Sequence, residues 1–126
     1  MLKVKTRIGP SQIEGLGLFA AEAIPKGTVV WALDERFDTR IPFEHYEAAP
    51  AIIRDHLWRY AWRDEVSWIN CGDDGRFINH SSTPNLGVSG SCESRAVRDI
   101  AEGEELTEDY GVFDIDFHQY KGVDWR

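Results

Sequence analysis

The chain has 126 residues, of which 42% are hydrophobic and 29% are charged, and these proportions are typical of one soluble domain. No apolar run approaches the roughly 18 residues of a membrane-spanning helix, and the first residues lack the apolar core of a signal peptide, so we expect a cytoplasmic protein without a membrane partner. The net charge is −8, and residues 96–126 contain nine acidic but three basic side chains. This excess argues against direct nucleic-acid binding and suits a basic partner, unless it serves only solubility.

The first third of the chain predicts short strands separated by turns. Alternating apolar and polar residues indicate a strand over residues 2–8, which Gly9 and Pro10 should end. Residues 24–27, Ile-Pro-Lys-Gly, predict a turn, and the β-branched and aromatic residues 28–33 predict a strand after it.

The middle and the end of the chain predict one main helix and several more strands. Pro42 and Pro50 can each begin a short helix. Helical spacing then gathers one mostly apolar face, formed by Ile52, Ile53, His56, Leu57, Tyr60 and Ala61. Further short strands are expected at residues 66–69, 86–88, 95–97 and 105–109, with a turn at 101–103. Many short strands with one main helix indicate an irregular, mostly β domain.

The two cysteines, Cys71 and Cys92, are expected to be free thiols, because the sequence gives no secretory context for a disulfide. A structural zinc site usually needs four Cys or His ligands at close spacing. The four histidines are scattered along the chain. We therefore expect no metal site.

Residues 76–85, Arg-Phe-Ile-Asn-His-Ser-Ser-Thr-Pro-Asn, form an unusually polar segment that begins with two apolar residues. Side chains of this kind hydrogen-bond main-chain groups and hold irregular backbone in place. Irregular backbone held in this way often carries a functional site. A well-capped surface loop is the alternative that this segment alone leaves open.

Two familiar motifs are not supported by their context. Gly15-Leu16-Gly17 resembles the start of a dinucleotide-binding loop, but Pro25 soon ends any helix that could follow. These glycines still allow main chain to lie close to a ligand, although a structural turn is the simpler reading. His80 has serine neighbours, yet no Gly-x-Ser-x-Gly elbow marks a nucleophile.

Three segments together, in this order, resemble the SET domain of protein-lysine methyltransferases. They are Gly15-Leu16-Gly17-Leu18-Phe19, then Arg76-Phe77-Ile78-Asn79-His80-Ser81 with Pro84-Asn85, then Gly103-Glu104-Glu105-Leu106-Thr107-Glu108-Asp109-Tyr110-Gly111. The resemblance implies a single SET domain over residues 1–126, with a β-clip-like fold of short strands and a C-terminal pseudoknot. Its core would cover residues 1–110, and the aromatic, acidic tail over residues 111–126 would close the substrate channel.

The resemblance also implies an S-adenosylmethionine-dependent enzyme that methylates a lysine of a basic protein or peptide. Tyr110 would be the catalytic residue, unless it is merely a buried tyrosine with a structural role. The implied cofactor-binding residues are Gly15, Leu16, Gly17, Arg76, Phe77, Asn79, His80 and Tyr110. A lysine channel needs aromatic walls, and the candidates, each of which could instead be a core residue, are Trp31, Tyr60, Trp62, Phe113 and Phe117.

The chain departs from the family pattern at two positions. Glu108 stands where members usually carry Tyr, Phe or another bulky residue that influences how many methyl groups are added. Its carboxylate could accept a hydrogen bond from the lysine or point to solvent, so the methylation state stays open. Glu108 also leaves open a catalytically inactive module that binds basic peptides. Ser82 replaces a zinc-binding Cys, which fits a minimal domain without zinc, and so small a domain could form a homodimer to complete its channel.

Overall fold

The computed structural model describes residues 1–89 and 92–113, and it shows short strands in four small sheets. Two antiparallel three-stranded sheets have the orders β3-β9-β8 and β4-β6-β5; an antiparallel pair joins β1 to β2, and a parallel pair joins β7 to β10. The strands are β1 Thr6–Pro10, β2 Leu16–Ala20, β3 Val29–Ala32, β4 Thr39–Pro42, β5 Trp62–Arg63, β6 Ser67–Asn70, β7 Asn79–His80, β8 Leu86–Ser89, β9 Glu93–Ala96 and β10 Thr107–Glu108. The helices are α1 Phe43–Ala48, α2 Ala51–Tyr60, the 3-10 helix η1 Asp74–Phe77 and α3 Tyr110–Phe113. The prediction of a mostly β domain is confirmed.

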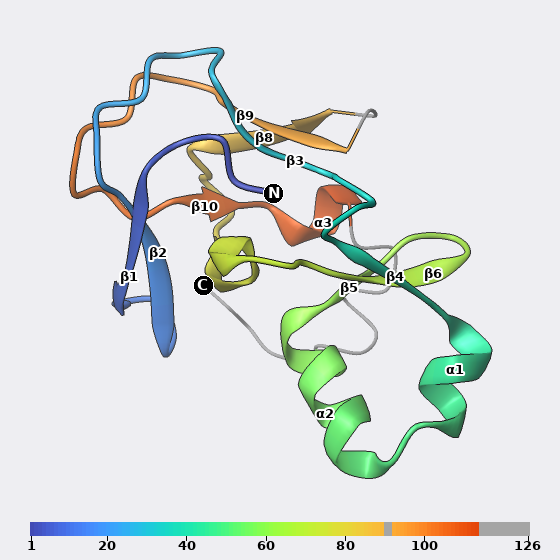
Figure 1. Ribbon diagram of the computed structural model, residues 1–126. Coiled ribbons are helices and arrows are strands. Elements are labelled where there is room, and N and C mark those ends of the chain that lie inside the picture. The colour runs from blue at the N-terminus through green and yellow to red at the C-terminus, as the bar shows by residue number, and fades with distance from the viewer. Residues whose placement is uncertain (90–91, 114–126) are drawn as a thin grey trace.

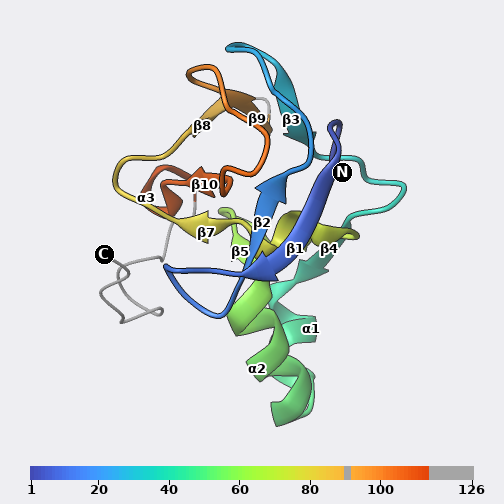
Figure 2. The same ribbon diagram turned by 90° about the vertical axis from the view of Figure 1, so that its left-hand side faces the viewer.

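The molecule has two ends with separate packing centres. Helices α1 and α2 lie at one end, and the β3-β9-β8 sheet lies at the other, in both views (Figure 1, Figure 2). The larger core gathers Leu18, Ala20, Ile24, Val30, Ile78, Leu86, Ala96, Ile100 and Leu106, and a smaller one gathers Leu57, Ala61 and Trp68 under the helices. Burying these side chains is the main stabilising term of the fold. Among the described residues, no helix is long and apolar enough to cross a membrane.

The first strand differs from its prediction at both ends. It starts at Thr6, because Leu2 makes only an isolated bridge to Trp31. It also continues through Gly9 and Pro10, where an end was expected. Proline is tolerated there because it is the last residue of the strand and needs no further ladder hydrogen bond.

The prolines mark the helix starts correctly, whereas the apolar face of α2 was overestimated. Helices α1 and α2 begin directly after Pro42 and Pro50. Leu57 is buried, but Ile52 and Ile53 are 77% and 48% exposed. Only the C-terminal half of α2 reaches the small core, so its first turn projects beyond the surface that could cover it.

The segment before β10 closes the centre of the fold. Residues 103–106 run along β2, where Leu106 N–H donates to the Leu18 carbonyl at 2.8 Å and Ala20 N–H donates to the Glu104 carbonyl at 2.9 Å. Strand β2 is therefore covered by β1 on one edge and by residues 103–106 on the other. This arrangement brings the first and third sequence motifs side by side.

Candidate active site

The polar segment at residues 76–85 begins with a tightly built turn. Asp73 caps η1 by accepting a 2.9 Å hydrogen bond from Gly75 N–H. A Cβ atom on Gly75 would lie 2.8 Å from the indole ring of Trp31. Glycine is needed at this position because the ring occupies the space of a side chain. The turn therefore seats Trp31 against the start of the polar segment.

The polar segment forms hydrogen bonds at two places with the last strand, β10, and the residues just before it. Strand β7 pairs in parallel with β10, and Ser81 N–H donates to the Glu108 carbonyl at 2.9 Å. At the other end the buried Asn85 side chain donates to the Glu105 carbonyl at 2.8 Å and accepts from Thr107 N–H at 2.9 Å. These two attachments are what the expected pseudoknot requires. Asn85 thus has a structural role that its place in the motif did not specify.

Tyr110 is fixed by two contacts to the same segment. Its main-chain N–H donates to Nδ1 of His80 at 3.1 Å, and its hydroxyl donates to the Ile78 carbonyl. The two rings lie 5.4 Å apart between centroids. Because Nδ1 of His80 accepts a hydrogen bond, the neutral ring carries its proton on Nε2. The imidazole, expected to bind cofactor, therefore uses one nitrogen to position Tyr110.

Asn79 connects the polar segment to the glycine loop. Its Nδ2 donates to the carbonyls of Glu14 and Leu16, each at 3.2 Å, and to Oε1 of Glu105 at 3.0 Å. Three acceptors around one atom assign that atom as the nitrogen. Among the described residues, Oδ1 receives no hydrogen bond, so it can accept one from a ligand.

The two glycines of the first motif have different surroundings. Gly15 has a φ of +48°, and no atom lies within 4 Å of the position that its Cβ would take. A Cβ atom on Gly17, by contrast, would lie 2.2 Å from Oε1 of Glu105. The close approach expected at Gly17 is therefore made by a carboxylate of this chain, which also accepts from Ser11 Oγ at 2.7 Å. Sequence reasoning missed Glu105, whose position in the third motif was the available signal.

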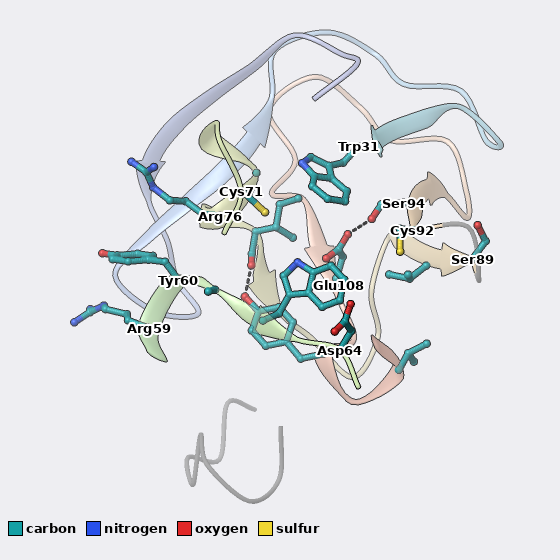
Figure 3. A pocket seen from close by; sticks show the side chains of 17 residues that line it. Trp31, Arg59, Tyr60, Asp64, Cys71, Arg76, Ser89, Cys92, Ser94 and Glu108 are labelled. Atoms are coloured by element: carbon teal, nitrogen blue, oxygen red, sulfur yellow. Dashed lines mark hydrogen bonds between the residues drawn. The ribbon is translucent and has the colours of Figure 1, made fainter. Parts of the chain in front are cut away.

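Tyr110 also lines a cavity of about 330 Å³, whose lining side chains are drawn in Figure 3. Of the predicted channel residues, its lining includes Trp31, Tyr60, Trp62 and Glu108. Of the predicted cofactor residues, it includes Arg76 and Tyr110, whereas Gly15, Leu16, Gly17, Phe77, Asn79 and His80 do not line it. The side chain of Phe113 and all of Phe117 lie outside the described residues. The structure thus forms two regions, a cavity and a glycine loop with Asn79, that meet near Tyr110.

Glu108 places a carboxylate in the wall of this cavity. The residue is 8% exposed, and Ser94 Oγ donates a hydrogen bond to its Oε1. Burial raises the pKa of Glu108 to about 7, against the opposing effect of the Ser94 hydrogen bond. The sequence left open whether the Glu108 carboxylate contacts the lysine or points to solvent, and its burial excludes an orientation toward solvent. Ser94 and Cys71 are lining residues that sequence reasoning missed, since neither belongs to a motif.

Curated relatives of the chain are histone-lysine N-methyltransferases by name. An H3 lysine-4 specific enzyme of Schizosaccharomyces pombe is 36% identical over 118 residues, which cover 86% of this chain and 13% of that protein. Histone-lysine N-methyltransferase 2D of Homo sapiens is 32% identical over 123 residues, covering 88% of this chain and 2% of that protein. The chain thus spans a small part of either relative. Both names specify histones, the proteins that package DNA. They contradict the cytoplasmic location that we expected from the lack of a signal peptide. That prediction is wrong.

The fold and the motifs match the same family. The crystal structure of the Chaetomium thermophilum polycomb repressive complex 2 superposes with a TM-score of 0.66 at 27% identity, covering 86% of this chain and 15% of that chain. The family model described as the SET domain matches residues 15–111. That range contains all three motifs and every residue of the cavity lining except Val112. The chain therefore belongs to the SET-domain family of methyltransferases.

Proposed function

We propose that the chain is an S-adenosylmethionine-dependent protein-lysine N-methyltransferase with Tyr110 as its catalytic residue. The observation that carries the proposal is that Tyr110 lines the aromatic cavity and also bonds to Ile78 and His80, the two residues beside Asn79. The Asn79 side chain in turn bonds to the loop that contains Gly15. Methyl transfer needs such a junction, because the amine and the methyl donor must approach in line from opposite sides. The comparisons lend no support to the inactive peptide-binding alternative.

The residues of the glycine loop fit the methyl donor of this family, S-adenosylmethionine. Gly15 leaves open space at its Cβ position, and Leu16 is 51% exposed. Asn79 Oδ1 can accept a hydrogen bond from an ammonium group, which the methionine part of the donor carries. When bound, S-adenosylmethionine supplies a methyl group on a positively charged sulfur. We propose that the remaining contacts come from the main chain of Gly17, whose side-chain position is filled by Glu105, and from Arg76, Phe77, His80 and Tyr110.

The cavity fits the side chain of a lysine. Aromatic rings of Trp31, Tyr60 and Trp62 line it, and such rings attract a cationic nitrogen while excluding water. The Tyr110 hydroxyl donates its proton to the Ile78 carbonyl, and a hydroxyl oxygen can also accept an N–H, here that of the target amine. An amine held in this way keeps its own lone pair aligned for attack.

The substrate is proposed to be a basic protein of the histone class. Two observations support this: the names of the relatives and the net charge of −8, which attracts lysine-rich and arginine-rich segments. A homodimer and a channel closed by residues 111–126 remain parts of the proposal. Sedimentation velocity tests the first, and methylation by a chain ending at residue 113 tests the second.

The proposed function is tested by labelling. A whole-cell lysate and purified core histones are incubated with the protein and S-adenosylmethionine carrying a labelled methyl group. We expect label on lysine, identified by mass spectrometry. Lysates in which no lysine gains label would contradict the proposal.

Tyr110→Phe should lower the methylation rate by at least about 100-fold, because the amine loses a hydrogen-bond partner that orients it. Calorimetric titration with S-adenosylmethionine should give nearly the same affinity as for the wild type. The matched control is Tyr46→Phe, since Tyr46 stacks on Trp68 in the small core, away from the cavity lining. Full activity of the Tyr110 variant would remove this residue from its proposed role.

A further inference from the structure

Glu108 offers a cavity-facing carboxylate that the proposed role of Tyr110 does not use. The residue ends β10, and its neighbours across the cavity include the buried Trp31, which is 6% exposed. In Figure 3 the carboxylate lies among the lining side chains and is joined by a dashed line to Ser94. Ser94 is itself 3% exposed on β9, so the hydroxyl that holds the carboxylate is fixed.

No cation of the described chain forms an ion pair with this carboxylate. Two arginines line the same cavity, but the guanidinium of Arg59 lies over the Tyr60 ring at 5.7 Å, and that of Arg76 lies over the Phe77 ring at 5.0 Å. A buried carboxylate ordinarily has a cation or several donors as partners. With one hydroxyl donor in a cavity, Glu108 is suited to a cation that enters from outside.

The other titratable groups that line the cavity do not compete as proton acceptors. Burial raises the pKa of Cys71 to about 12, so its thiol stays neutral. Asp64 forms an ion pair with Arg40 at 2.7 Å and accepts three further hydrogen bonds from residues 66 and 67. The remaining titratable side chains of the described lining contain no carboxylate; they are those of Tyr60, Tyr110, Cys92, Arg59 and Arg76.

Resting on the proposed function, we propose that Glu108 receives the ammonium group of the target lysine and takes its proton before methyl transfer. The N–H bond breaks, and an O–H bond forms on Glu108. The electron pair left on nitrogen then forms the N–CH₃ bond, while the S–CH₃ bond breaks and its electron pair stays on sulfur. After the methylated ammonium leaves, Glu108 releases its proton to water.

The environment of Glu108 suits this exchange. Its pKa, raised by burial to about 7, lets the carboxylate exist at neutral pH and still hold a proton for the time of one reaction. A lysine in water has a pKa of about 10.4, so about one molecule in 2,500 is neutral at pH 7. A proton acceptor inside the cavity removes that limit. This role as proton acceptor also explains why a carboxylate lies in a cavity lined by aromatic rings.

Amine binding can be tested without methylation. The probes are n-pentylamine, which is cationic at pH 8, and 1-pentanol, which has nearly the same shape without charge. Tryptophan fluorescence reports their binding, since Trp31 and Trp62 line the cavity. We expect the wild type to prefer the amine at least tenfold and Glu108→Gln to lose that preference. Glu104→Gln, which removes a surface carboxylate paired with Arg98, should keep it. An unchanged preference in Glu108→Gln would overturn the proposal.

The pH dependence of kcat/KM tests the proton transfer on the protein that the labelling experiment identifies. Between pH 7 and pH 9.5 we expect a nearly flat profile for the wild type, because Glu108 accepts the proton. The Glu108→Gln variant can use only lysine that is already neutral in solution. Because that fraction rises about tenfold per pH unit, the kcat/KM of the variant should rise by the same factor. Parallel profiles would overturn the proton-transfer step. If the wild-type protein prefers the amine but methylates nothing, the proposed function and the proton transfer are both wrong. The binding of an amine by Glu108 would still stand.

Discussion

At the scale of single residues, the site depends on groups whose surroundings differ sharply over short distances. Gly15 and Gly17 are two positions apart, yet the first faces open space and the second packs against Glu105. Glu104 is partly exposed and paired with Arg98, whereas Glu108 is buried with one hydroxyl donor among the described residues. Burial and partners, rather than residue type, therefore determine what each group can do.

Glu108 should make the stability of the protein depend on pH. Its pKa is about 7 in the folded chain and 4.5 as an ordinary glutamate, so between these values the folded state holds more protons. The free energy of unfolding contributed by this group should therefore fall as pH rises from about 4.5 to 7, by on the order of 3 kcal/mol.

Glu108→Gln removes this dependence, because its amide resembles the protonated acid in shape and stays neutral. Urea denaturation of both proteins at pH 5, 6, 7 and 8 measures the difference. The variant should differ from the wild type by less than about 1 kcal/mol at pH 5 and be clearly the more stable protein at pH 8. Two curves that stay parallel across this range would show that Glu108 titrates normally.

At the scale of elements, the β1-β2 hairpin and the third motif are joined through the space beside Gly17. Gly17→Ala should destabilise the protein by about 2–3 kcal/mol, because the new methyl group displaces Glu105 from its bonds to Ser11 and Asn79. The same change at Gly9 is the matched control, since there the nearest atom is a Phe19 ring carbon at 3.5 Å, an ordinary contact. Gly9→Ala should change stability by less than about 1 kcal/mol.

A double mutant separates the steric cause from other effects of Gly17→Ala. In a Glu105→Ala background the clashing carboxylate is absent, so Gly17→Ala should destabilise by at least about 1 kcal/mol less than in the wild type. Chemical denaturation of the four proteins measures this coupling. If the two changes add without coupling, the contact between Gly17 and Glu105 does not explain the glycine.

The elements also show where sequence reasoning succeeds. Turns at residues 24–27 and 101–103 and the helix starts after Pro42 and Pro50 were predictable, because proline and glycine act through the local backbone alone. Strand β5, with two residues, carries no readable alternation. The same holds for η1, and neither element was predicted.

Over the whole molecule, what could not be predicted is the meeting of distant segments. The contacts of Glu105 join residues 11, 17 and 79, and no local pattern contains that information. Ile52 and Ile53 follow helical spacing, but their exposure depends on how far the small core extends. The order of three motifs predicted the fold because it carries long-range information that periodicity lacks.

The charge of the whole chain leads to a prediction about salt. A net charge of −8 should attract a basic substrate over distances set by the Debye length, which falls from about 30 Å at 0.01 M ionic strength to about 10 Å at 0.1 M. The KM for a lysine-rich protein should therefore rise several-fold over this range, while kcat stays nearly constant, because the aligned amine lies in a cavity that mobile ions do not fill. Initial rates at a series of salt concentrations measure both quantities. The matched control is a short, uncharged peptide with one lysine, whose KM should change much less, since a single charge gains little from the field of the protein. Equal salt dependence for both substrates would mean that the acidic surface serves solubility rather than recognition.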